Sequence, residues 1–174
     1  RIKKLLSSKF FWEKVNQYPV VIYDKEGSNT IKSLFLSNSF FILETRIKNI
    51  NIPILFKSII KDNFHWTPQS YIHQYIIAIN PSVIITTIDN NINFWKLKDK
   101  FKNIKTIFIQ NGNRDNVTDV FSKLKSQDLN KYSVDKMFVF NKAIGNEFSK
   151  YINGEIISIG SFNNNKFPIS KKDD

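Results

Sequence analysis

The feature that most constrains the fold is a set of short apolar runs, each followed by polar residues. The runs are rich in Val, Ile and Phe and are almost continuously apolar, without alternation between apolar and polar positions. Strands that are buried on both faces of a parallel sheet have this pattern. The predicted strands are Val20–Tyr23, Phe40–Glu44, Val83–Ile88, Thr106–Ile109, Met137–Phe140 and Ile156–Ile159.

Helix-like segments separate these runs. Thr67-Pro68 opens one helix and Pro81 closes it. Asn116–Lys125 predicts a second, with Val117, Val120, Phe121 and Leu124 on one face. A third carries Ile144, Phe148, Tyr151 and Ile152 on one side and is expected to end at Asn153-Gly154. This alternation predicts right-handed βαβ units, and so a doubly wound, Rossmann-like α/β domain with a parallel sheet of about six strands and helices on both faces.

The length of 174 residues and the 41% hydrophobic content fit one domain. We assign residues 1–165 to a Rossmann-like domain, and residues 166–174 to a tail or the start of a linker to a second domain. The first residue is Arg, so we expect the chain to be a piece of a longer protein. Arg1–Val15 mixes lysines with apolar residues. It is read either as a basic amphipathic helix on a membrane surface or, preferably, as a helix packed on the sheet.

Several classes of chemistry lack their residues here. There is no cysteine and there are two histidines, which excludes a thiolate metal site and leaves a usual zinc site without enough ligands. The glycine patterns of dinucleotide-binding and P-loop proteins are also absent. From the two observations together, neither a metal nor a cofactor is expected. The net charge of +11 comes almost wholly from lysines spread along the chain. That distribution favours a solvated surface over a nucleic-acid partner.

Polar residues follow every predicted strand, and ligands of open parallel sheets bind beyond the carboxyl ends of the strands. Asp89 and Glu26 are the candidate general bases, because each follows a strand beside glycine or amide residues. Amides and carboxylates in such positions suit sugar hydroxyls, although helix capping explains part of the pattern. The candidate substrate-binding residues are Gly27, Ser28, Asn29, Asn90, Asn91, Gln110, Asn111, Gly112, Arg114, Asn141, Lys142, Gly160 and Ser161.

Four segments at these strand ends resemble segments of the surface carbohydrate biosynthesis proteins of bacteria. These proteins look like members of the broader two-domain (GT-B) glycosyltransferase architecture. The segments are ITTIDNN (Ile85–Asn91), IFIQNG (Ile107–Gly112), VFNKAIG (Val139–Gly145) and ISIGSFNNN (Ile157–Asn165). The resemblance spans Val20 to Asn165. Related transferases often have Gln-His-Gly where this chain has Gln110-Asn111-Gly112, so no histidine-based role is carried over to this position.

The resemblance implies transfer of a sugar from a nucleotide-activated donor to a lipopolysaccharide or capsule acceptor. This chain would be the acceptor-side half, and a second domain would hold most of the nucleotide-sugar donor. The glycan or lipid-linked acceptor implies a cytoplasmic location, with peripheral contact at the inner face of the membrane. Two alternatives stay open, namely a sugar-nucleotide epimerase of similar architecture and a non-catalytic basic module that binds membrane or nucleic acid.

Overall fold

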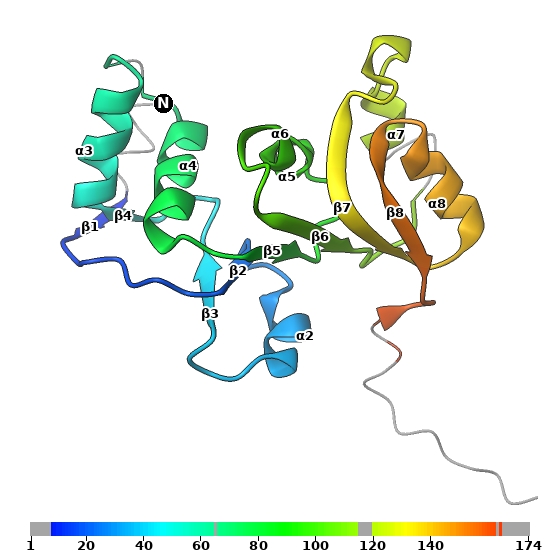
Figure 1. Ribbon diagram of the computed structural model, residues 1–174, viewed down its shortest axis with the longest axis horizontal. Coiled ribbons are helices and arrows are strands. Elements are labelled where there is room, and N and C mark those ends of the chain that lie inside the picture. The colour runs from blue at the N-terminus through cyan, green and yellow to red at the C-terminus, as the bar shows by residue number, and fades with distance from the viewer. Residues whose placement is uncertain (1–7, 65, 115–119, 163, 165–174) are drawn as a thin grey trace, which may run out of the picture. The chain divides into compact units, whose positions relative to one another are not determined.

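The computed structural model describes residues 8–64, 66–114, 120–162 and 164, and its main sheet has six strands. The strand order is β3-β2-β5-β6-β7-β8, and β2 pairs in parallel with β3 and β5, as β7 does with β6 and β8. Helices flank the sheet, which confirms the predicted Rossmann-like α/β class (Figure 1). The strands are β2 (Val20–Tyr23), β3 (Phe40–Leu43), β5 (Val83–Thr86), β6 (Lys105–Ile109), β7 (Tyr132–Val139) and β8 (Ile152–Ser158).

The first four predicted strands agree with the structure within two residues, whereas the last two begin earlier than predicted. β7 begins at Tyr132 and not at Met137, and β8 begins at Ile152 and not at Ile156. The extra residues at the start of each strand include polar side chains that are partly or fully exposed, such as Ser133 and Asn153. Only the second half of each strand is therefore continuously apolar, and the sequence predicts only that half.

The helix expected to end at Asn153-Gly154 is shorter than predicted. It is α8 (Lys142–Ser149), and Ile152, Asn153 and Gly154 belong to β8. A Cβ at Gly154 would lie 2.3 Å from the carbonyl oxygen of Val134 in β7. The glycine therefore allows β8 to approach β7 closely, and it does not end the helix.

The prediction of a helix over Arg1–Val15 is wrong in its described part. Lys9–Phe11 forms strand β1, which pairs in parallel with β4 (Asn49–Asn51) in a separate two-stranded sheet. Residues 1–7 lie outside the described residues. Pairing with a strand about 40 residues further along the chain overrides the local helical pattern, as tertiary contacts often do for weak propensities.

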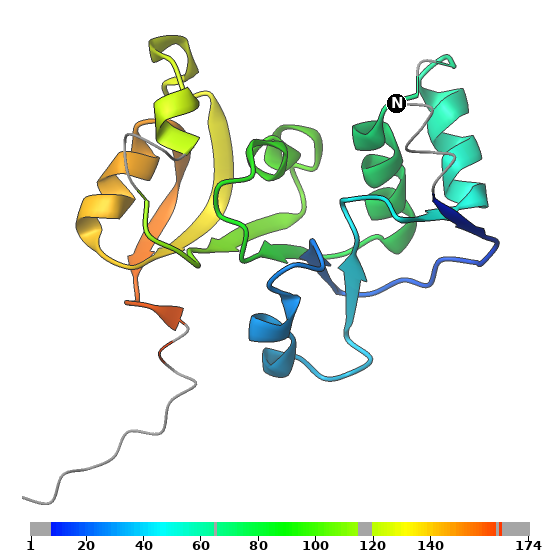
Figure 2. The same cartoon turned by 180° about the vertical axis from the view of Figure 1, so that it is seen from behind.

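The chain divides into two compact units. The first unit comprises residues 1–86 and 102–105, and the second comprises residues 87–101 and 106–174. In the first unit, α4 (Pro68–Ile79) begins at a capping box in which Thr67 and Ser70 exchange hydrogen bonds, and its neighbour α3 (Ile52–Lys61) is capped by Asn51. α3 and α4 lie side by side, and Figure 2 shows the same pair from behind. The predicted helix after Thr67-Pro68 is thus confirmed.

Shorter helices complete the first unit. α2 (Ser28–Ile31) continues into the 3-10 turn η1 (Lys32–Leu34). α2 and α4 lie on opposite sides of strands β2 and β3 (Figure 1). The middle of β2 is accordingly buried, with both Val21 and Ile22 at 1% exposure or less.

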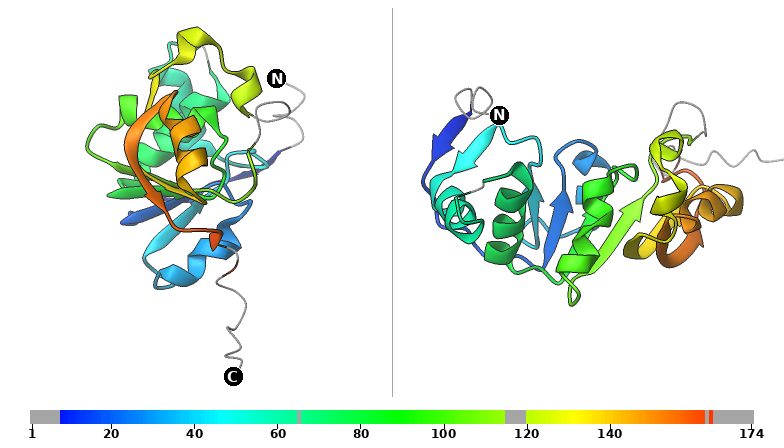
Figure 3. Two further views of the ribbon diagram at one scale, coloured as in Figure 1. Left: turned by 90° about the vertical axis from the view of Figure 1, so that its right-hand side faces the viewer. Right: turned by 90° about the horizontal axis from the view of Figure 1, so that it is seen from above.

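The core of the second unit is a cluster of aromatic rings around Phe148 of α8. The Phe148 ring lies 5.0 Å from those of Phe108 and Phe121 and 6.3 Å from that of Trp95, measured between centroids. The rings come from β6, α7, α5 and α8, and α8 packs along β7 and β8 (Figure 3). The helices of this unit are α5 (Ile92–Trp95), α6 (Leu97–Lys100), α7 (Val120–Lys123), the 3-10 turn η2 (Ser126–Asp128) and α8. The predicted helix Asn116–Lys125 thus forms at Val120–Lys123, and its first residues lie outside the described part.

Asp135 of β7 accepts hydrogen bonds from Lys98 and Thr106, and these bonds predict that the stability of the protein depends on pH. Burial alone would raise the pKa of Asp135, but hydrogen bonds from Lys98 and from the N–H and hydroxyl of Thr106 outweigh burial and lower it. A depressed carboxyl pKa contributes stability above the pKa of the unfolded chain, and this stability is lost as the pH falls through the folded value.

We therefore expect Asp135→Asn to lower the free energy of unfolding by about 1–3 kcal/mol at pH 7. The difference from the wild type should shrink below about pH 4, where the unfolded carboxyl is protonated. Urea denaturation at pH 7 and pH 3 measures both values. A difference that is equal at the two pH values would contradict the role given to the ionised carboxylate.

Candidate functional site

The second unit contains a polar cluster around Asp89, which follows β5 in the sequence. We call Asp89, Gln110, Asn111 and Arg114 the Asp89 cluster. The Arg114 guanidinium donates hydrogen bonds to both carboxylate oxygens of Asp89. Its Nε lies 2.7 Å from Oδ2, and its Nη2 donates to Oδ1. The Asn111 N–H also donates to Oδ1, at 3.5 Å. The structure thus brings together three of the polar residues that the sequence analysis selected.

The Asp89–Arg114 ion pair is buried. The side chain of Asp89 is 0% exposed and that of Arg114 is 9% exposed. Burial raises the pKa of the Asp89 carboxyl, while the hydrogen bonds and the charge of Arg114 act in the opposite direction. The indole N–H of Trp95 donates to the Asp89 carbonyl at 2.9 Å, so the backbone is held as well. In this conformation Asp89 orients Arg114, and a substrate hydroxyl reaches the carboxylate only if the pair opens.

Gln110 joins the ends of β6 and β7. Its Oε1 accepts a hydrogen bond from the Phe140 N–H at 2.8 Å, and its Nε2 donates to the Gly112 carbonyl at 2.8 Å. The side chain is almost fully buried, and the Gln110 N–H donates to Phe138. This bridge between strand ends explains the glutamine before Asn-Gly. Gly112 lies in the turn whose carbonyl accepts the hydrogen bond from Gln110.

Amides and one lysine are among the exposed residues of this strand edge. Asn90, Asn111, Asn141 and Lys142 are exposed, and Ser161 is half-buried. Two of the predicted asparagines cap helices, since Asn91 accepts from the N–H groups that begin α5 and Asn141 accepts from the Ile144 N–H in α8. Gly160 follows β8 with a φ of 72°, and its N–H donates to the Phe140 carbonyl. The second unit therefore combines a buried frame with an exposed rim of amides.

The first unit has its own polar strand edge, where β2 and β3 end. Asp24 has a φ of 83° and is buried, and its carboxylate accepts hydrogen bonds from the Glu26 N–H and the Thr45 hydroxyl. Glu26 is exposed and forms an ion pair with Arg46. A cleft of about 190 Å³ lies here, and we call it the charged cleft; it is lined by Asp24, Lys25, Glu26, Glu44, Arg46 and Lys48.

The glycine turn predicted beside Glu26 is present. Gly27 has a φ of 78° and precedes α2, which is one turn long. Ser28 is buried and Asn29 is exposed. Thr45 was not predicted, because a single hydroxyl one residue after a strand carries no distinctive signal.

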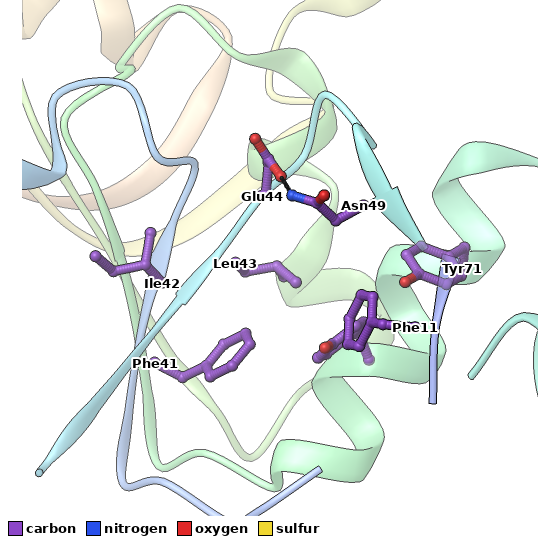
Figure 4. A pocket seen from close by; sticks show the side chains of 8 residues that line it. Phe11, Phe41, Ile42, Leu43, Glu44, Asn49 and Tyr71 are labelled. Carbon is purple, nitrogen blue, oxygen red and sulfur yellow. Dashed lines mark hydrogen bonds between the residues drawn. The ribbon is translucent and has the colours of Figure 1, made fainter. Parts of the chain in front are cut away.

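A second hollow in the first unit was also missed by sequence reasoning. It has a volume of about 170 Å³, and Figure 4 shows its side chains. Phe41 stacks on Tyr75 with ring centroids 5.4 Å apart, and the Asn49 amide donates to the Glu44 carboxylate at 3.0 Å. We call it the aromatic pocket, and its lining residues are Phe11, Phe41, Ile42, Leu43, Glu44, Asn49, Tyr71 and Tyr75. They come from four separate elements, so no local sequence pattern could reveal it.

Among the described residues, no group of three or more His, Asp and Glu side chains could hold a metal ion. No helix in this part of the chain combines the length and the apolar character needed to cross a bilayer.

Comparison with known proteins relates part of the chain to one family of described function. Residues 107–174 match the model of a family described as "putative O-antigen biosynthesis protein". The matched stretch contains Gln110, Asn111 and Arg114 of the Asp89 cluster, and three of the four segments on which the resemblance rests; Asp89 itself lies outside it. No curated protein and no solved structure matches the chain. The stretch that forms the Asn111 and Asn141 rim is thus similar to a family linked by its description to O-antigen synthesis.

Proposed function

We propose that this chain is the acceptor-side half of a glycosyltransferase that moves a sugar from a nucleotide-activated donor to a surface polysaccharide or lipopolysaccharide acceptor. The family match over residues 107–174 supports the coarser statement, a role in the synthesis of surface carbohydrate. The observation that carries the proposal is the buried Asp89–Arg114 pair and the buried Gln110 at the carboxyl ends of parallel strands, together with the exposed amides of Asn90, Asn111 and Asn141 at these strand ends. Amide groups can both donate to and accept from sugar hydroxyls.

The proposed roles follow from exposure. Asn90, Asn111, Asn141 and Lys142 would contact the substrate, because their side chains are accessible. The Asp89–Arg114 pair would hold the loop that presents Asn111. Glu26 and Asp89 stay the two candidate general bases for an acceptor hydroxyl: Glu26 is exposed and paired with Arg46 in the first unit, and Asp89 is buried against Arg114 in the second.

The nucleotide-sugar donor would be held mostly by a second domain, and the acceptor would be a glycan or a lipid-linked glycan. Contact with the inner face of the cytoplasmic membrane is part of the proposal. It is supported by the exposed Phe56 and Ile60 on α3 and by Phe64 beyond its end, which lie near Lys57 and Lys61 in the sequence. Exposed aromatic residues beside lysines suit an anionic lipid surface.

Transfer is tested with the full-length protein, membranes that carry the acceptor, and radiolabelled nucleotide sugars. We expect label to enter the glycan, and Asn111→Ala to lower kcat/KM about tenfold through the loss of one or two hydrogen bonds. Asn103→Ala is the matched control, because Asn103 is an exposed asparagine in the first unit, outside both polar strand edges.

Two outcomes would contradict the proposal. Conversion of the donor in the absence of acceptor would indicate a sugar-nucleotide epimerase. A lack of any turnover, together with binding to nucleic acid or vesicles that falls steeply with salt, would indicate a basic binding module.

A further inference from the structure

The aromatic pocket lies beside β3, the strand at one edge of the main sheet. The carbonyls of Ser39, just before β3, and of Leu43, its last residue, accept hydrogen bonds from the N–H groups of Val20 and Asp24 at the two ends of β2. Residues of a parallel strand direct their backbone groups alternately to its two sides. The N–H and C=O groups of Ile42 therefore point away from β2, toward the outer edge of the sheet.

Aromatic rings form much of the pocket wall. Four aromatic side chains line the pocket: Phe11 of β1 and Phe41 of β3, which are half-exposed, and Tyr71 and Tyr75 of α4. The Tyr71 hydroxyl accepts a hydrogen bond from the Asn51 N–H at 2.8 Å. Glu44 and Asn49 add polar groups to the wall, and they are joined by a hydrogen bond.

This combination of surfaces suits a sugar ring. The C–H faces of a pyranose pack on aromatic rings, and its hydroxyls pair with carboxylate, amide and backbone groups. The volume of about 170 Å³ is well below the roughly 300 Å³ at which pockets for drug-sized ligands begin, so it fits one ring and not an oligosaccharide.

We propose that the aromatic pocket binds a single pyranose ring of the glycan acceptor through stacking on Phe41 and hydrogen bonds to Glu44. The choice of a sugar as ligand rests on the proposed function. The site itself is distinct from the Asp89 cluster, since all of its lining residues belong to the first unit.

The test is saturation-transfer NMR of the full chain with methyl glycosides of glucose, galactose, mannose, rhamnose, N-acetylglucosamine and N-acetylgalactosamine. No nucleotide sugar is present, so sugar binding and sugar transfer can fail separately. We expect at least one glycoside to bind, and Glu44→Gln and Phe41→Leu each to weaken its affinity about tenfold.

Lys48→Gln is the control that separates the two hollows, because Lys48 lines the charged cleft and not the aromatic pocket. We expect it to leave the affinity unchanged. Phe41→Leu removes a stack on Tyr75, so thermal unfolding is measured in parallel, and Glu44→Gln provides an independent readout at the mouth of the pocket. Absence of binding by every glycoside, or binding that Lys48→Gln weakens and Phe41→Leu does not, would overturn the proposal.

Discussion

Asp89→Ala is expected to lower the free energy of unfolding by about 3–5 kcal/mol, because it leaves the Arg114 guanidinium buried without its partner. The change also removes the acceptor of the Asn111 N–H, so the loop that carries the exposed amide loses its anchor. Urea denaturation of the chain, followed by circular dichroism, measures the effect.

The double variant Asp89→Leu/Arg114→Met separates stability from function. Replacing both partners by apolar side chains of similar size is often neutral for stability, because no buried charge is left unpaired. We therefore expect the double variant to recover most of the lost stability while sugar transfer by the full-length protein stays impaired. Recovery of full transfer would show that the ion pair serves folding only. Failure to recover stability would contradict the account of the single variant.

Phe148→Ala is the substitution with the second large effect, and we expect it to lower the free energy of unfolding by about 3–5 kcal/mol. Phe148 is fully buried, and its ring contacts those of Trp95, Phe108 and Phe121. Removal of the ring leaves a cavity among rigid neighbours that cannot collapse onto it. Equilibrium denaturation monitored by tryptophan fluorescence measures the loss.

Phe56→Ala provides the matched control for Phe148→Ala. Phe56 is the same residue type on α3, and it is 56% exposed. We expect the free energy of unfolding to change by no more than about 0.5 kcal/mol, as for most surface substitutions. Equal losses in the two variants would contradict the assignment of the core to the ring cluster around Phe148.

The strands and the polar residues that follow them could be predicted from the sequence because both are local patterns. Runs such as Val20–Tyr23 are continuously apolar, and the structure places β2 at those residues. Thr67-Pro68 marked the start of α4 for an equally local reason, since a cap needs only the residues of the first turn. The errors arose where a local signal had two meanings. Asn153-Gly154 resembles a helix end, but Gly154 serves the close approach of β8 to Val134.

Hydrogen bonds between residues far apart in the sequence could not be predicted from local patterns. Asp89 and Arg114 are 25 residues apart, and Gln110 and Phe140 are 30 apart. Each pair meets because of the order of strands in the sheet, which a single sequence does not state. The same holds for β1, which appeared helical until its pairing with β4 was known.

The sequence by itself determined the α/β class, most strand positions and the polar character of the strand ends. These depend on hydrophobic periodicity and on capping, which act over a few residues. The tertiary structure alone decided which polar groups are buried as framework, such as Asp89 and Gln110, and which are exposed, such as Asn111 and Glu26. Burial and hydrogen-bond partners depend on the packing of segments far apart in the chain, and no local pattern encodes that packing.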